Sequence, residues 1–482
     1  MTVGFATIHT RFGVSNKMLA SGSVIIRSFA SKLLSLMLFG VPGLKRVLGG
    51  IAVLILAGVS FVSCGGSSSN NTSKSGFGFR AFVSNPLQPA SGSAFAVFNI
   101  VDAAKDSNTG LFVNLSGTST FPGMMVLTPN LKDTLVFSST GNTVAVVDNA
   151  SEGVGQSSGG PLPAMPLLGP TESMLVWIDS STAFVAVPSA TVAGHPTGAV
   201  EVLGFLSGST SPEAVIPIAS AHYLVQSHNG NRILVFSDNP QNSQDSPPEC
   251  PTAQCITMIS PSLLGSEPRT AISSSTFDHP VWGVFSSDDS KAYIFNCGPE
   301  CGGTTASISV LDFTQNPPAV TSSIEVPAAT FGLLSGTTLY VAGTPSGIPC
   351  PSGVIDTTCG LLTSVDTGSL TVAGSFTITE GYHDHMVMGA NGQLFMGASG
   401  TRSICSSCLT IFNTTNSNVV FPPDNGYVTG IEPITDRNVA YVCQNGRLRI
   451  YDTTTDALQA TQADIVGQAI DVKLVDPPGN FN

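Results

Sequence analysis

Short apolar runs alternate with polar turns along most of the chain, and one arrangement recurs eight times between Arg80 and Asp452. Each copy is an apolar segment, a loop, and a second apolar segment that usually ends in Asp or Asn. The first segments begin 45 to 59 residues apart, near Arg80, Thr134, Thr182, Arg232, Lys291, Thr337, Gln393 and Asn438. The second segments cover 95–102, 143–148, 198–203, 255–260, 307–312, 361–366, 409–413 and 447–452. A period of roughly 40 to 50 residues without a helical signal is typical of β-propeller blades.

Further apolar segments and tight turns flank each copy, so we predict that each blade is a four-stranded antiparallel sheet. The turns contain Gly, Asn and Asp, which tolerate the positive φ of two-strand hairpins. The first copy lacks an inner strand, and the apolar segment 469–475 at the end of the chain has no partner. We therefore predict an all-β, eight-bladed propeller over residues 78–482, closed by pairing of this C-terminal strand with the N-terminal blade. Seven blades is the alternative, if the weak copy 182–203 is an insertion.

The first 63 residues do not fit the repeat. Lys45 and Arg46 precede an apolar run, 47–62, which Phe61-Val62-Ser63-Cys64 closes with the small residues of a cleavage site. This segment resembles the lipobox of bacterial lipoproteins, which implies that Cys64 carries a lipid. A start at Met37 gives a leader of 27 residues, so we interpret the earlier residues as an upstream mis-called start. An uncleaved transmembrane anchor is the alternative, but 16 apolar residues fall short of the roughly 20 that span a bilayer.

Charge narrows the expected partners. Residues 1–63 hold six of the 18 basic residues and none of the 31 acidic ones, so the remainder carries 12 minus 31, or −19, formal charges. No basic stripe is left to neutralise phosphates, which argues against nucleic acid as a partner. Residues 64–77 are rich in Gly, Ser and Asn and are expected to form a flexible tether. The sequence predicts an exported monomer that meets a bacterial membrane only through its lipid.

The repeat resembles the YVTN family of bacterial propellers, in which a YVAN strand is followed by VSVIDTATN. Residues 438–455, NVAYVCQNGRLRIYDTTT, and 135–148, LVFSSTGNTVAVVD, carry this resemblance, which spans most of residues 78–475. The strand-ending Asn of the family is often replaced, for example by Ser138 or Cys443, and several loops between the second and third strands are longer. The resemblance therefore implies the propeller fold and no particular activity.

Eight cysteines after Cys64 form close pairs in the loops between the second and third strands of four consecutive blades: Cys250 and Cys255, Cys297 and Cys301, Cys350 and Cys359, Cys405 and Cys408. Because disulfides persist in exported proteins, we predict four local cross-links, with Cys443 left as a buried free thiol. A redox motif at Cys405-Ser-Ser-Cys408 lacks a helix to present its first thiol. A zinc site would require loops of separate blades to converge.

Candidate chemistry gathers where the inner strands begin, on the face that these loops are expected to share. The side chains concerned are Glu172, His222, Asp278, His279, His383, Asp384 and His385. Imidazoles and carboxylates around a narrow channel could bind a divalent metal or act on a substrate. The alternative is that they hydrogen-bond loop backbone and water at a polar channel mouth.

Two functions fit these observations. The first is a non-enzymatic binding module without a cofactor, which uses its disulfide-stiffened loops to bind an envelope protein, peptide or glycan. The second is a propeller hydrolase or lyase, resembling lactonases or streptogramin lyases, with the His and carboxylate groups at the channel mouth. The Gly155–Gly159 match to a nucleophile elbow has no helix after it, and no phosphate loop or dinucleotide fingerprint is present.

Overall fold

The computed structural model describes residues 73–477, apart from 91–92, 116–120, 158–159, 238–253, 401–404 and 435. These residues belong to one compact unit, Thr72–Asn482. They form β-strands joined by turns, with two short 3-10 helices, η1 (Pro261–Leu263) and η2 (Gly298–Cys301). The predicted leader, the lipidation site Cys64 and most of the tether lie outside the described residues. Within the described ranges, no helix has the length and apolar character needed to cross a membrane.

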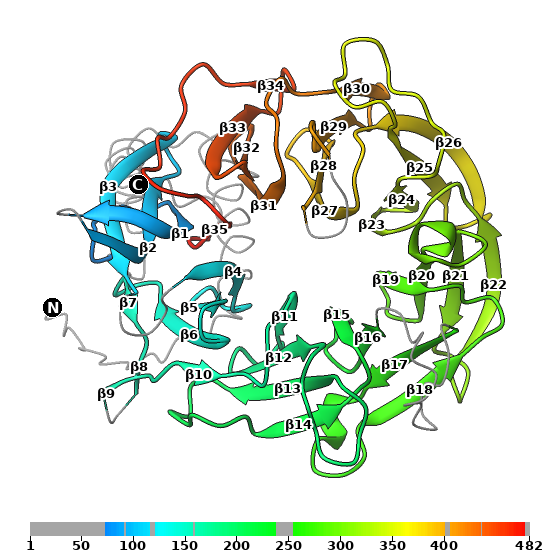
Figure 1. The fold of residues 1–482 in the computed structure, drawn as a ribbon, viewed down its shortest axis with the longest axis horizontal. Coiled ribbons are helices and arrows are strands. Elements are labelled where there is room, and N and C mark those ends of the chain that lie inside the picture. Colours follow the sequence, from blue (N-terminus) through cyan, green and yellow to red (C-terminus); the bar gives the residue numbers. More distant parts are fainter. Residues whose placement is uncertain are drawn as a thin grey trace, which may run out of the picture. The chain divides into compact units, whose positions relative to one another are not determined.

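Eight antiparallel blades surround a central channel (Figure 1). Each has four strands in sequence order from the axis outward, except that the inner strand of blade one comes from the C-terminus; blade two adds β7 (Gly153–Val154), which also pairs with β6. Blades one to four are β35 (Val472–Leu474), β1 (Arg80–Ala90), β2 (Ser93–Asp102) and β3 (Ser107–Asn114); β4 (Pro122–Leu127), β5 (Asp133–Ser138), β6 (Thr143–Asp148) and β10 (Met165–Pro166); β11 (Ser173–Val176), β12 (Thr182–Val187), β13 (Ala199–Gly204) and β14 (Ala214–Pro217); β15 (Ala221–Gln226), β16 (Ile233–Ser237), β17 (Cys255–Ile259) and β18 (Arg269–Ser273). Blades five to eight are β19 (Pro280–Phe285), β20 (Lys291–Asn296), β21 (Ser307–Asp312) and β22 (Ala319–Glu325); β23 (Phe331–Ser335), β24 (Thr338–Gly343), β25 (Gly360–Asp366) and β26 (Thr371–Ile378); β27 (His383–Met388), β28 (Gln393–Ala398), β29 (Leu409–Asn413) and β30 (Asn418–Val420); β31 (Val428–Ile434), β32 (Val439–Gln444), β33 (Arg447–Asp452) and β34 (Ala457–Leu458).

The predicted all-β fold with eight blades is confirmed, and the seven-blade alternative is wrong. The weak copy at 182–203 forms β12 and most of β13 in a complete blade, between β11 and β14. Its strands pair over six residues, from Thr182↔Gly204 to Val187↔Ala199, so it is no insertion.

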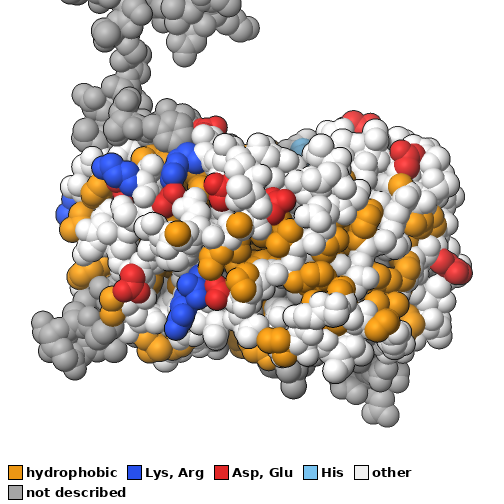
Figure 2. All heavy atoms as spheres, turned by 90° about the horizontal axis from the view of Figure 1, so that it is seen from above, with side chains coloured by type: hydrophobic (Ala, Val, Ile, Leu, Met, Phe, Trp, Pro, Cys, Tyr) orange, Lys and Arg blue, Asp and Glu red, His pale blue; other side chains and the backbone are white. Residues whose placement is uncertain are grey.

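The second and third strands of a blade are buried on both faces because each sheet packs between two neighbouring sheets. In β5 and β6 nearly every residue is buried, which explains why these strands read as continuous apolar runs. The outer strands are more exposed, as in β22. On the side of the propeller that Figure 2 shows, apolar side chains lie scattered among polar ones and charged groups are few.

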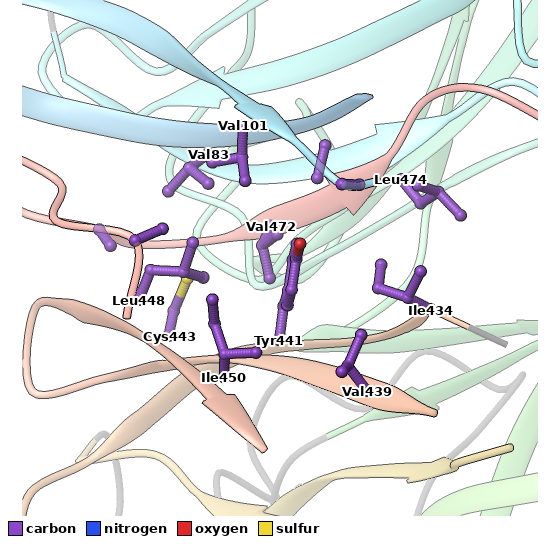
Figure 3. Close-up of a cluster of buried hydrophobic side chains, with 14 of the residues drawn as sticks. Val83, Val101, Ile434, Val439, Tyr441, Cys443, Leu448, Ile450, Val472 and Leu474 are labelled. Carbon is purple, nitrogen blue, oxygen red and sulfur yellow. The ribbon is translucent and has the colours of Figure 1, made fainter. Parts of the chain in front are cut away.

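The C-terminal strand closes the ring as predicted. β35 pairs antiparallel with β1, with Val472 opposite Val83 (Figure 1). Val472 and Leu474 are buried in a cluster that joins blade one to blade eight, where they pack with Val83 and Tyr441 (Figure 3). This burial removes apolar surface from water and covers the inner edge of β1.

Two buried ionic contacts reinforce the closure. Arg80 of β1 binds Asp476 through its backbone N–H (2.7 Å), its Nε (2.9 Å) and its Nη2 (2.7 Å). The Nη1 of Arg80 donates to Glu152 of blade two at 2.6 Å. Asp106, after β2, accepts from the Tyr441 hydroxyl at 2.6 Å and from Arg437 Nη2 at 2.8 Å, both in blade eight. The first blade is thus fixed to both of its neighbours.

Three of the predicted disulfides are present: Cys297–Cys301, Cys350–Cys359 and Cys405–Cys408. Cys255 is also disulfide-bonded, and Cys250 lies outside the described residues. Each bridge stiffens a loop between the second and third strands of its blade. Cys443 is a buried free thiol, as predicted, and burial raises its pKa well above the usual value.

Candidate channel-mouth site

A cavity of about 550 Å³ occupies the channel. Its walls come from the inner strands β4, β15, β23, β27, β31 and β35 and from the segment before β11. Ser399, directly after β28, also lines it, so the cavity reaches the face from which the disulfide-bonded loops emerge.

β-Bulges decide which side chains reach this mouth. The inner strands β4, β15, β19, β27 and β31 all shift register near their first residues. The residues skipped by the pairing include His222, Val281, Asp384 and Thr429. Asp471 occupies the corresponding place in blade one, where Ser84 accepts from Ile470 N–H and donates to the Asp471 carbonyl. A bulge re-aims the unpaired side chain, so neighbouring blades present such residues at equivalent positions.

Asp384 and His385 form a fixed pair on β27. His385 Nδ1 lies 2.7 Å from Asp384 Oδ1, and Asp384 also accepts from the Ser399 N–H (3.1 Å) and the Ser399 hydroxyl. Burial acts to lower the pKa of His385, but the charge and hydrogen bond of Asp384 outweigh burial and raise it. The same bonds lower the pKa of Asp384 against the effect of its own burial. The pair therefore favours an imidazolium beside a carboxylate.

The closing strand adds a second ionic group. Asp471 accepts hydrogen bonds from Met125 N–H and Val472 N–H, both 2.8 Å long, and from Lys473 Nζ at 3.2 Å. Glu432 of β31 accepts from the Leu474 N–H at 3.2 Å. Burial raises the pKa of Glu432 to about 7, although Lys473 opposes this shift. The pKa of Lys473 is raised because the charges of Asp471 and Glu432 outweigh its burial.

Glu172 and His222 form a further contact at the mouth. Glu172 lines the cavity, and its carboxylate lies 3.2 Å from His222 Nδ1. Glu172 is 45% exposed and His222 17% exposed, so this pair is open to solvent on the Glu172 side.

Aromatic rings form another part of the wall. Tyr223 and Phe331 line the cavity, and Trp282 lies between them. Trp282 stacks on Phe331 with ring centroids 4.5 Å apart and meets Tyr223 edge-on at 5.8 Å. Blades four, five and six thus contribute a row of contacting aromatic rings, of which Tyr223 and Phe331 line the cavity.

The structure separates Asp278 and His279 from this cavity. They line a second cavity of about 710 Å³, which shares no residue with the first. Asp278 accepts from the N–H groups of Thr304 and Thr305, both at 2.7 Å, and from His279 Nδ1 at 2.9 Å. These bonds outweigh burial and lower the pKa of Asp278 to about 2. Asp278 therefore organises the loop that follows the Cys297–Cys301 bridge.

His383 is fully buried, and neither of its ring nitrogens has a hydrogen-bond partner among the described residues. Burial lowers its pKa to about 4, although the charge of Asp384 opposes the shift. The ring is therefore neutral under ordinary conditions and does not reach the cavity.

Of the candidate residues, the structure brings Glu172, His222, Asp384 and His385 to the channel mouth. The three Asp-His or Ala-His copies looked equivalent in sequence but differ in register: His222 is a bulged residue, His279 precedes β19, and His385 follows a bulge. Sequence reasoning missed Asp471, Lys473 and Glu432. The sequence does contain a signal for Asp471 and Lys473, because they are two charged residues within the otherwise apolar segment 469–475.

Within the described part of the chain, no three His, Cys, Asp or Glu side chains are placed so that they could hold a metal ion. Each imidazole at the mouth has one carboxylate partner, whereas a metal site needs several converging ligands.

Comparisons with known proteins show the fold alone. No family model and no curated protein matches the chain. Among solved structures, dihydro-heme d1 dehydrogenase NirN matches with a TM-score of 0.53 and 11% identity, over 84% of this chain and 76% of that one. Hydrazine synthase of Kuenenia stuttgartiensis matches with a TM-score of 0.50 and 14% identity, over 71% and 98%. The periplasmic gluconolactonase PpgL of Pseudomonas aeruginosa matches with a TM-score of 0.44 and 13% identity, over 82% and 98%.

Proposed function

We propose that this protein is a lipid-anchored, extracytoplasmic propeller that binds a protein, peptide or glycan of the cell envelope at the mouth of its central channel. The observation that carries the proposal is the channel cavity, whose wall combines charged side chains held by hydrogen bonds with the aromatic rings of Tyr223 and Phe331. Concave sites with apolar walls and a few fixed polar groups are typical of ligand binding. Bonded cysteines in three loops support export to an oxidising compartment.

The mouth suits binding better than catalysis because its carboxylates and imidazoles already bond to one another or to the backbone. Both oxygens of Asp384 accept hydrogen bonds, and His385 Nδ1 faces Asp384 rather than the cavity. Both carboxylate oxygens of Asp471 likewise accept hydrogen bonds, from two backbone N–H groups and from Lys473. These bonds fix the side chains of a recognition surface at the mouth.

One observation favours the hydrolase or lyase as a second candidate. Burial raises the pKa of Glu432 to about 7, and Glu432 lies near Lys473 of the cavity wall, which makes it a candidate to give or take a proton at neutral pH. A screen of lactones and other esters with the purified propeller tests this reading. Turnover that disappears in Glu432→Gln would favour the enzyme, whereas turnover equal in both proteins would not come from this site.

Blocking the cavity tests the binding function. Thr429 lines the mouth at a bulge, so Thr429→Trp places a large ring in the cavity. Thr415→Trp is the matched control, because Thr415 is exposed in the turn between β29 and β30. On an array of envelope glycans, peptidoglycan fragments and peptides, we expect ligands whose affinity falls at least about tenfold in Thr429→Trp and stays unchanged in Thr415→Trp. Ligands that bind both variants equally would place the binding surface elsewhere.

The anchor is tested separately. We expect Cys64→Ala to abolish incorporation of labelled fatty acid and to release the protein from the membrane fraction. Fatty-acid labelling that survives this substitution would disprove the anchoring site.

A further inference from the structure

We propose that the channel cavity recognises a carboxylate-bearing sugar, a uronic acid unit of an acidic glycan, with its carboxylate on Lys473 and His385 and its ring against Tyr223 and Phe331. This inference rests on the proposed function and narrows it to one class of ligand.

The cavity wall holds two cations, Lys473 and His385, among the carboxylates of Asp471, Asp384 and Glu172. Lys473 and His385 have 24% and 29% of their side chains exposed, whereas their counter-ions Asp471 and Asp384 have only 6% and 15% exposed. Each cation is thus more exposed than the carboxylate with which it pairs. In both pairs the cation is therefore the partner that a ligand reaches more easily.

The hydrogen bonds at these two pairs also favour a ligand that supplies acceptors. The Asp471 and Asp384 carboxylates are occupied by backbone N–H groups, by Ser399 and by their own cations. Lys473 Nζ has three donors and uses one on Asp471, and His385 uses Nδ1 on Asp384. Donors therefore remain on Lys473 Nζ and on His385 Nε2, and a ligand carboxylate supplies acceptors for both.

Two further carboxylates lie close to this site, Glu172 on the cavity wall and Glu432 beside Lys473. Glu172 is paired with His222. Burial raises the pKa of Glu432 to about 7, and its Oε1 accepts from the backbone of β35 rather than facing the cavity as a free anion.

The aromatic surface selects a ring. Tyr223 and Phe331 line the same cavity as the two cations, and Trp282 contacts both of their rings. The flat C–H face of a sugar packs well on aromatic rings, whereas an extended peptide presents no such face. At about 550 Å³ the cavity has the size of a small-ligand site and accommodates the end of an oligosaccharide.

The proposed contacts predict a pH dependence with a definite sign. The titratable groups that act on His385 are Asp384, Asp471 and Lys473, and Glu432 acts on Lys473. Asp384 has a lowered pKa and Lys473 a raised one, so neither changes charge near neutrality. His385 loses its positive charge as the pH rises through its raised pKa, and Glu432 gains a negative charge as the pH passes about 7. Both changes weaken anion binding as the pH rises.

Calorimetric titration of the full propeller with trigalacturonate tests the inference, with maltotriose as the neutral sugar and an acetylated tripeptide with a free carboxylate as the peptide. We expect trigalacturonate to bind at least about tenfold more tightly than either, and more tightly at pH 6 than at pH 8. Lys473→Gln and His385→Gln should each lose about tenfold, and Lys473→Arg, which keeps the cation, should recover part of that loss. His385→Gln should also flatten the pH dependence. Lys132→Gln is the control, since Lys132 is exposed in the turn before β5.

Each other outcome has a definite meaning. Equal affinity for maltotriose, an unchanged affinity in Lys473→Gln, or preference for the tripeptide would overturn the uronate assignment. If no uronate binds but another array ligand is blocked by Thr429→Trp, this inference fails and the proposed function stands. If Thr429→Trp affects no ligand at all, both fail. A thermal melt of each variant distinguishes a loss of affinity from a loss of fold.

Discussion

Removing the carboxylate of Asp476 tests how the ring is held closed. Asp476 follows the closing strand β35 and accepts three hydrogen bonds from Arg80, at 2.7, 2.9 and 2.7 Å. The Arg80 side chain is 3% exposed and that of Asp476 is 11% exposed, so water replaces little of what Asp476→Ala removes. The substitution leaves a buried guanidinium with Glu152 as its remaining ionic partner.

Breaking a buried ion pair by removing one partner costs about 3–5 kcal/mol. Glu152 still compensates part of the Arg80 charge, so we expect the lower end, about 3 kcal/mol. With an unfolding entropy of ~2.1 cal/mol/K per residue, a loss of this size lowers the Tm of so large a domain by only about 3–4 °C. Guanidinium unfolding is the better assay, because a midpoint shift without a change of slope reports stability directly.

Asp464→Ala is the matched control, since Asp464 is exposed in the segment just before β35. We expect this control to unfold within about 0.5 kcal/mol of the parent. Equal midpoints for Asp476→Ala and Asp464→Ala would mean that the Arg80–Asp476 contact does not stabilise the closed ring, and the account of the closure would then rest on the apolar cluster alone.

Three further predictions follow from the fold. A chain lacking residues 469–482 should lose cooperative unfolding, measured by circular dichroism, because β1 loses its inner partner; a melt like that of the parent would refute this. His383 is held neutral with a pKa of about 4, so its contribution to stability is complete above about pH 6.5 and is lost as the pH falls toward 4. His383→Met should therefore flatten the stability profile between those values, and an unchanged slope would contradict the burial argument. Cys443 should resist thiol reagents in the native protein and react only on unfolding, and rapid native labelling would show that it is accessible.

The fold could be predicted from sequence because its information is local. A strand buried between two neighbouring blades needs a continuous apolar run, and the turns need residues that accept positive φ. The hairpin between β32 and β33 shows both, since Asn445 and Gly446 have φ values of 50° and 72° between two buried strands. The closure was predictable too, because an unpartnered strand at one end and a missing inner strand at the other complement each other.

The site was only partly predictable because it depends on register across separate blades. A one-residue bulge decides whether a side chain near the start of an inner strand reaches the channel, and sequence does not mark these bulges. His279 and Asp278 resemble His385 and Asp384 in sequence, yet they line a different cavity. Lys473 was overlooked because its segment was interpreted only as a structural strand, although β35 also lines the channel.

The pairing of Val472 with Val83 has a consequence for how the chain matures. Blade one stays one strand short until residues 472–474 have been synthesised, so the inner edge of β1 is uncovered until then. Contacts so distant in sequence form slowly. The cysteine pairs, by contrast, are at most nine residues apart where the bridges are described, so the loops of blades five to seven can be cross-linked before blade one is complete.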